Sequence, residues 1–313
     1  MTIGIGAAGP NAGLAVFRAL AAAEAVGHGA IGGFAVFAVL TADGRVIRAE
    51  TQRGGSATLF TDGETTGGPP PPEVASARFA ALMSSGPDRP APLSQFLAAS
   101  EAGLVTGHRL PNMPGSDGRP VNEAVLSAMA EGLSAEQSLQ RVLNADPDAD
   151  AGMIALGPSR GIAALNSSLV AARPDLGTAT RASKEAAVCV LHNAIRPAAD
   201  LAPLVAAIAI ETMAPPSSPA GHAVVRTGTP LALSEANQVI LGPDDVAMLV
   251  KTTDARILTG RHACAAIYLG AAVVRNGQLL GHTTMEPNVL VEDGHIIRLS
   301  GQSEARIPFA AKE

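Results

Sequence analysis

The chain has 313 residues, with 22 Lys and Arg against 28 Asp and Glu, and a formal net charge of −6 at pH 7. A hydrophobic content of 47% excludes a disordered chain, and an acidic balance with no Trp and one Tyr argues against a nucleic-acid binder. The most apolar stretch, 204–210, is far shorter than the roughly 18 residues of a membrane-spanning helix. We therefore expect a cytoplasmic protein with no membrane partner.

The chain begins with a short apolar run over 2–8, followed by a helix and a hairpin. Apolar residues at helical spacing predict the helix over 11–26, with Asn11 as its N-cap. The hairpin consists of an apolar run over 32–40 and an alternating run over 45–52, joined by a turn at Asp43-Gly44.

The next segments are less regular. Helical periods predict short helices over 73–84 and 93–102. The Gly- and Pro-rich stretches 54–72 and 103–120 predict irregular loops.

The helix-hairpin pattern then returns. A helix is predicted over 121–130, and a second opens at Ser134, which has Gln137 at capping-box spacing. Strands over 152–156 and 162–168, joined by a Gly- and Pro-containing turn, complete the second unit. A strand over 186–195 and a helix over 198–211 follow.

A Pro-rich linker is predicted at 215–219, and beyond it the chain is mostly strand, with hairpin turns at Asn276-Gly277 and at 292–294. We expect a layered α+β core over 1–214, and a strand-rich extension over 220–313 that packs on it. Helices that cover stacked sheets predict an αββα-type sandwich.

Three segments of the second unit carry a resemblance to a known superfamily. They are Glu131-Gly-Leu-Ser-Ala-Glu-Gln-Ser-Leu139, Leu143-Asn-Ala-Asp-Pro147, and the hairpin with Gly152-Met-Ile-Ala-Leu156 and Gly161-Ile-Ala-Ala-Leu165. They resemble an uncharacterised N-terminal-nucleophile (Ntn) hydrolase-like family with a "GLSAEEAL…L…DP" helix before its hairpin. The first unit, with its Ala-rich helix, Gly-rich strand and Asp-Gly turn, is similar to the start of γ-glutamyltransferases and plant-type asparaginases.

The resemblance implies an αββα sandwich and a Thr nucleophile that begins a strand, with its own amine as the base. Carried onto this chain, that position falls at Asp150 or Ala151, and neither side chain can act as such a nucleophile. We therefore expect a single chain, uncleaved near residue 150.

Three residues are candidates for catalysis. Thr2 would expose a Thr amine if Met1 were removed, and the alternative is an ordinary strand start. Ser167 is a nucleophile only with a base nearby, and the alternative is a capped strand end. His192 could act as an acid or base near neutral pH, or be a satisfied structural histidine.

We predict a small-molecule cleft where the two helix-hairpin units face each other, lined by Arg53, Asn166, Ser167 and His192. Arg53 would supply the charge for a carboxylate. The scattered histidines and two cysteines predict no metal site, and no dinucleotide or phosphate-loop motif indicates a cofactor.

Two functions remain open: a non-catalytic protein that binds a small carboxylate or amide, and a hydrolase of small amides or peptide-like substrates. The assembly state is also open, with a homo-oligomer as one expectation.

Overall fold

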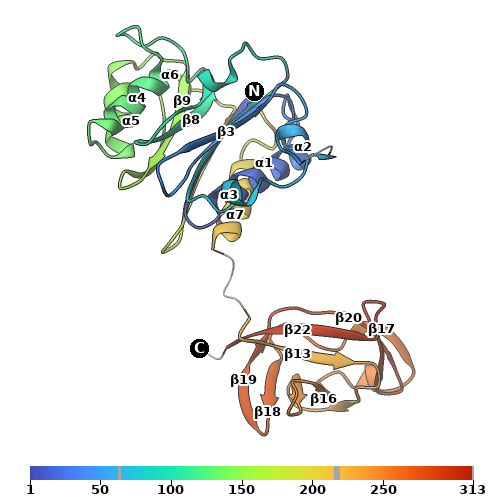
Figure 1. Ribbon diagram of the computed structural model, residues 1–313. Helices are drawn as coiled ribbons and strands as arrows, with labels where there is room; N and C mark the ends of the chain where they lie inside the picture. The colour runs from blue at the N-terminus through green and yellow to red at the C-terminus, as the bar shows by residue number, and fades with distance from the viewer. Residues whose placement is uncertain (63–64, 215–218, 312–313) are drawn as a thin grey trace. The chain divides into compact units, whose positions relative to one another are not determined.

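The computed structural model describes residues 1–62, 65–214 and 219–311. Its contacts divide the chain into two units, Met1–Pro215 and Pro216–Glu313, and each unit is described by itself (Figure 1). Most of the predicted linker, residues 215–218, lies outside the described residues. The packing of the second unit on the first stays a prediction.

The first unit contains a six-stranded antiparallel sheet with β1 (Thr2–Ala8) near its centre. Ile3, Ile5 and Ala7 on one face of β1 pack against α1 (Ala12–Val26) and α7 (Leu201–Met213) in one core. Across the sheet the strands are β11 (Leu176–Ala182), β12 (Ala187–Asn193), β1, β6 (Phe79–Ser85), β2 (Ala35–Leu40) and β3 (Val46–Thr51).

A four-stranded antiparallel sheet packs on the other face of the first. It contains, in order, β10 (Gly161–Asn166), β9 (Ala151–Gly157), β8 (Gly103–Arg109) and β7 (Ala98–Ser100). One core fills the space between the sheets. In it, Ala81 and Met83 of β6 pack with Leu104 of β8 and Ile154 of β9. Helices α4 (Val121–Ala130) and α5 (Ala135–Ala145) cover the outer face of the smaller sheet.

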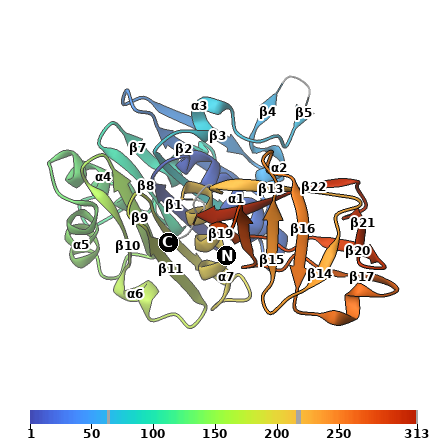
Figure 2. The same ribbon diagram turned by 90° about the horizontal axis from the view of Figure 1, so that it is seen from below.

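The order of layers is therefore helix, sheet, sheet, helix, as Figures 1 and 2 show, with α4 and α5 on one side and α1 and α7 on the other. The predicted α+β class is confirmed. Both helix-hairpin units are present, as α1–β2–β3 and α5–β9–β10, and they contribute to different sheets.

Local sequence signals decide the ends of these elements. The Ser134 hydroxyl accepts from the N–H of Gln137, and the Gln137 side chain accepts from the N–H of Ser134, so the predicted capping box is confirmed. Asn11 precedes α1 as predicted, but it has a left-handed φ of 56° and its side chain makes no capping hydrogen bond.

Three predictions between residues 73 and 109 are wrong. The helix predicted over 73–84 is a four-residue turn of helix, α3 (Pro72–Ala75), followed by strand β6. The helix predicted over 93–102 is a 3₁₀ turn, Leu93–Phe96, followed by β7. The loop predicted over 103–120 begins with strand β8. Strands β6 and β8 are buried on both faces, so their sequences lack the alternation that would distinguish a strand from a helix.

Short elements complete the first unit. They are α2 (Ser56–Leu59), β4 (Thr61–Asp62), β5 (Thr65–Thr66) and α6 (Ser168–Ala171). Every helix among the described residues is too short or too polar to cross a bilayer.

The second unit is built almost entirely from strands around one core. A seven-stranded sheet contains β13 (Gly221–Arg226), β22 (Glu304–Ala311), β19 (Gln278–Thr283), β18 (Ala272–Arg275), β15 (Gln238–Leu241), β16 (Ala247–Thr252) and β14 (Leu231–Leu233). A three-stranded sheet contains β17 (Arg261–Ala265), β20 (Asn288–Glu292) and β21 (His295–Leu299), and a 3₁₀ turn spans Ala255–Leu258.

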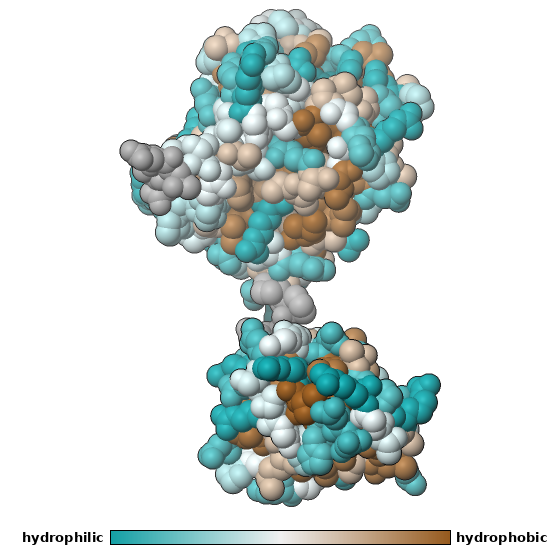
Figure 3. Space-filling model, turned by 90° about the vertical axis from the view of Figure 1, so that its right-hand side faces the viewer, coloured by the Kyte–Doolittle hydropathy of each residue, from teal (hydrophilic) through white to brown (hydrophobic). Residues whose placement is uncertain are grey.

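Both hairpin turns predicted in the second unit are confirmed. Asn276 and Gly277 have φ of 50° and 78°, and Asp293 and Gly294 have φ of 45° and 73°, the left-handed pairs that tight hairpins require. The segment that precedes the first of these turns forms two strands, β17 and β18. Figure 3 shows apolar side chains on one face of each unit as separate groups among hydrophilic ones, as is usual for protein surfaces.

Glycines on β1 allow the two sheets of the first unit to approach each other closely. A Cβ atom on Gly4 of β1 would lie 2.5 Å from the carbonyl oxygen of Gly107 of β8. A Cβ on Gly6 would lie 2.7 Å from a methyl carbon of Ile154 of β9. Only glycine allows this separation of β1 from the smaller sheet.

We expect Gly4→Ala to lower the free energy of unfolding by about 1–3 kcal/mol, the usual cost of overfilling a packed interior. Gly68→Ala is the control, because a Cβ there would meet nothing within 4 Å and its φ is not in the left-handed region. Its free energy of unfolding should change by less than about 0.5 kcal/mol. Urea unfolding measures both, and equal midpoints for the two variants would contradict the close approach.

Candidate active site

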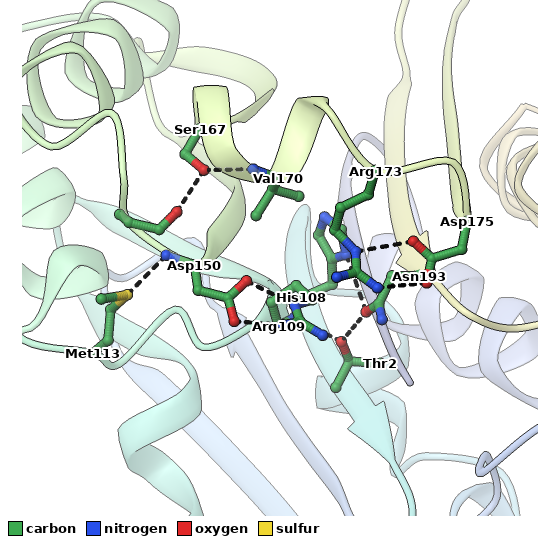
Figure 4. A network of polar contacts seen from close by, with 11 residues as sticks. Thr2, His108, Arg109, Met113, Asp150, Ser167, Val170, Arg173, Asp175 and Asn193 are labelled. Carbon is green, nitrogen blue, oxygen red and sulfur yellow. Dashed lines mark hydrogen bonds and ion pairs between the residues drawn. The ribbon is translucent and has the colours of Figure 1, made fainter.

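The side chain of Thr2 lies where the two sheets of the first unit meet. Thr2 is the first residue of β1, pairs with Asn193 of β12 and Ser85 of β6, and is 6% exposed. Its hydroxyl donates to Asn193 Oδ1 at 2.7 Å and accepts from the backbone N–H of Arg109 at 2.6 Å. Figure 4 shows these groups converging from β1, β12 and β8. The two hydrogen bonds fix the hydroxyl oxygen in one position.

Arg109 supplies its N–H from a strained backbone. Its φ is 67°, in the left-handed region that a long side chain rarely adopts. The guanidinium is held by Asp150 through two hydrogen bonds, Nε to Oδ1 at 2.7 Å and Nη2 to Oδ2 at 2.5 Å. The Asp150 carbonyl also accepts from the N–H of Leu110 at 2.9 Å. The hydrogen bonds from Arg109 lower the pKa of Asp150, so this carboxylate stays charged and holds the turn.

A buried polar chain extends from Thr2 into the space between the sheets. The ring of His108 lies 3.3 Å, through Nδ1, from Asn193 Oδ1, and 2.8 Å, through Nε2, from Asn166 Oδ1. Burial lowers the pKa of His108, so the ring is neutral near pH 7 and donates through one nitrogen only. Among the described residues, the buried Asn193 Nδ2 has no hydrogen-bond partner. An unsatisfied amide donor therefore lies beside the Thr2 hydroxyl.

Charged groups surround the start of β1. Arg173 and Asp175 form a second two-bond pair, with distances of 2.9 and 2.7 Å. The pKa of the Met1 amino group is lowered, mainly by burial and then by the positive charges of Arg109 and Arg89. Burial and positive neighbours at this place therefore shift an amine toward its neutral form, which is the form that accepts protons.

A cavity of about 390 Å³ opens beside Thr2. Its wall combines aromatic and aliphatic side chains with a few polar and charged ones, the usual character of a small-molecule site. The lining residues are Met1, Thr2, Phe34, Met83, Arg89, Pro90, Gln95, Phe96, Arg109, Leu110, Asn112 and Asp150. Within the described chain, no three His, Cys, Asp or Glu side chains gather as they would around a metal ion.

A family model described as "Domain of unknown function (DUF6963)" matches residues 2–222. The chain belongs to this family. The matched range contains every residue of the Thr2 site, from Thr2 to Asn193. A second model, "Domain of unknown function (DUF7259)", matches residues 228–304 in the second unit. No curated protein and no solved structure matches the chain. Neither description names an activity, so the resemblance to Ntn hydrolases stays a prediction.

The structure places the predicted site residues in different parts of the first unit. Thr2 and Asn166 belong to the polar chain around the active-site candidate. Ser167 does not belong to it. The Ser167 hydroxyl donates to the Ala149 carbonyl at 2.5 Å and accepts from the N–H of Val170, so Ser167 caps α6.

Arg53 is not part of this cluster. It lies at the end of β3, the far edge strand, where it pairs with Asp88 at 2.7 Å and is 74% exposed. Asn166 lies on β10, which packs near β12. Four strand spacings separate β12 from β3, which is about 19 Å at about 4.8 Å each. The predicted cleft between the hairpin ends is therefore corrected to the cavity beside Thr2.

His192 faces away from Thr2. It lies on the same face of β12 as Val188 and Val190, which pack toward α1 and α7. The adjacent Asn193 points to the other face, between the sheets. The ring is fully buried, and within the described residues neither nitrogen has a partner. Burial lowers its pKa to about 4.

Sequence reasoning missed His108, Arg109, Asn193 and the role of Asp150. His108 and Arg109 belong to the segment predicted as a loop. That segment is buried on both faces, so its sequence offers no clear alternation that would have revealed the strand.

His192 predicts an acid dependence of stability. Its pKa is about 4 when folded and about 6.5 when unfolded, so between these values the unfolded state binds the extra proton. Above pH 6.5 the ring is neutral in both states, and burying it carries no protonation penalty. As the pH decreases from 6.5 toward 4, the free energy of unfolding falls by up to about 3 kcal/mol. Urea unfolding of wild type and His192→Leu across this range should show a shallower pH dependence in the variant. Parallel curves would contradict the assignment.

Proposed function

We propose that the first unit is an amide hydrolase in which the hydroxyl oxygen of Thr2 is the nucleophile. The observation that carries the proposal is the Thr2 hydroxyl, fixed by two hydrogen bonds at the wall of a small-molecule cavity and next to an unsatisfied amide donor. The layer order and the resemblance to Ntn hydrolases support it. The nucleophile is then the first residue of β1 and not the position near Asp150.

The mechanism requires a free amine on Thr2, and therefore removal of Met1. Removal of Met1 would place the new amine on Thr2, on the same cavity wall as Arg109 and Arg89. Burial and positive neighbours both lower the pKa of an amine. The neutral Thr2 amine would accept the proton of its own hydroxyl.

The chemistry is an acyl transfer in two steps. The Thr2 oxygen attacks the substrate carbonyl, and its proton passes to the Thr2 amine. The carbon–nitrogen bond then breaks, and the leaving amine takes the proton. Water, deprotonated by the same amine, hydrolyses the ester and restores the hydroxyl.

A non-catalytic binding protein is the second candidate. The observation in its favour is that the Met1 carbonyl accepts a hydrogen bond from the Ser85 hydroxyl, which holds Met1 in place and leaves the Thr2 nitrogen in a peptide bond. If Met1 is retained, the cavity can bind a ligand but lacks the base. The intact mass of the purified protein distinguishes the two candidates.

We expect a β-lactone electrophile to add its mass once to the wild-type protein, at residue 2. Thr2→Ser should react as well, because it keeps both hydroxyl and amine, whereas Thr2→Ala should not react. Mass spectrometry of the intact chain and of its peptides measures removal of Met1 and the site of labelling. Labelling of Thr2→Ala equal to that of wild type, or a wild type without Met1 that does not react, would reject the nucleophile.

We also expect Asp150→Asn to slow this acylation about 10- to 100-fold, because the Arg109 turn that aims its N–H at Thr2 loses its charged partner. Asp117→Asn is the matched control, since Asp117 forms a similar pair with Arg119 on the exposed surface. The control should react at the wild-type rate. Equal rates for the two variants would show that Asp150 does not position the site.

A further inference from the structure

Arg89 is held in a defined orientation at the wall of the cavity. The side chain of Gln52 clamps its backbone, accepting from the Arg89 N–H at 3.0 Å and donating to its carbonyl at 2.9 Å. Arg89 Nη2 donates to the Ser85 hydroxyl at 2.8 Å, and the guanidinium carbon lies 5.9 Å from the centre of the Phe34 ring. These contacts order a long side chain that would otherwise sample many rotamers.

The charge of Arg89 has no counter-ion in the described residues, because no carboxylate there lies within 4.0 Å of it. Arg109, on the same cavity wall, is paired with Asp150. A partly buried guanidinium is stabilised by a paired anion, and its planar donors fit a carboxylate. The Arg89 guanidinium is therefore ordered, and none of the described residues supplies the anion that would stabilise it.

Asn112 is a second polar residue on the wall of the same cavity. Its Nδ2 donates to Gln95 Oε1 at 2.7 Å, and its Oδ1 is buried away from the cavity surface, without a partner among the described residues. Phe34, Met83 and Phe96 provide apolar surface between these polar groups.

We infer that the substrate is a small amide that carries a carboxylate, bound by Arg89. This inference rests on the proposed function for its reaction but not for its binding. Arg89 bonds to the Ser85 hydroxyl, and Ser85 of β6 pairs directly with Thr2 of β1. The carboxylate site therefore adjoins the strand pair that carries the nucleophile, close enough for a small molecule to span both.

Binding is tested in the Thr2→Ala variant, which keeps the cavity without the nucleophile. The probes are N-acetylglycine and N-acetylglycinamide, which have the same size and differ only in the carboxylate. Calorimetry should give an affinity at least about tenfold higher for N-acetylglycine, the scale of a charge-assisted hydrogen bond. Equal affinities, or no binding of either probe at millimolar concentration, would overturn the inference.

Arg89→Gln in the same background should lose about 10- to 100-fold in affinity for N-acetylglycine and bind the two probes equally. Arg89→Lys should retain part of the preference, because it keeps the charge without the planar fork. Arg141→Gln is the control, since that exposed arginine of helix α5 pairs with Glu131 and does not line the cavity, and it should bind as the background does. Thermal unfolding confirms that each variant is folded. An unchanged preference in Arg89→Gln would overturn the assignment.

The two proposals fail separately. If the carboxylate preference depends on Arg89 but the wild-type protein neither reacts with the lactone nor cleaves N-acetylglycine, the binding site stands and the hydrolase is rejected. If the wild type reacts with the lactone but the probes bind equally, the nucleophile stands and the carboxylate site is rejected.

Discussion

The close approach of β1 to β8 is the constraint on which the rest of the first unit depends. Gly4 and Gly107 allow the two backbones to approach to a separation that any side chain on residue 4 would prevent. Because strand residues alternate between faces, Thr2 points to the same side as Gly4. The Thr2 hydroxyl can then reach the N–H of Arg109 in the opposite sheet at 2.6 Å. A site made from both sheets is thus a consequence of the glycines that bring them together.

The site is polar and buried, and its stability requires compensation for both features. The left-handed φ of Arg109 costs on the order of 1–3 kcal/mol, and the partly buried pair with Asp150 offsets part of that cost. His108 lies within hydrogen-bond distance of Asn193 and Asn166, and its neutral ring donates to one of the two amide oxygens. Asn193 Nδ2 near Thr2 and Asn112 Oδ1 have no partner among the described residues, and neither have the ring nitrogens of His192 on the opposite face of the sheet. Folding alone does not account for the cost of such buried unsatisfied groups.

Sequence reasoning succeeded where the information is local. The turns at Asp43-Gly44 and Asn276-Gly277 and the capping box at Ser134 each depend on residues close together in the chain, and all are confirmed. It failed for β6 and β8, because strands buried on both faces have no alternation. Thr2 was found as a candidate, but its partners Arg109 and Asn193 lie 107 and 191 residues away. Pairings at that separation are decided by sheet topology, which a single sequence does not specify.

The same dependence on topology separates the position that the resemblance implies from the residue that we propose. Counting back from Leu156 assigns the nucleophile to the start of β9, the second strand of the smaller sheet. In this fold the strand that enters the space between the sheets with a hydroxyl-bearing residue is β1, near the centre of the larger sheet. Asp150 is close to Thr2 in space because β9 pairs with β8, and Arg109 connects the two residues. The residue that seemed to rule out catalysis therefore supports the turn that holds the hydroxyl in position.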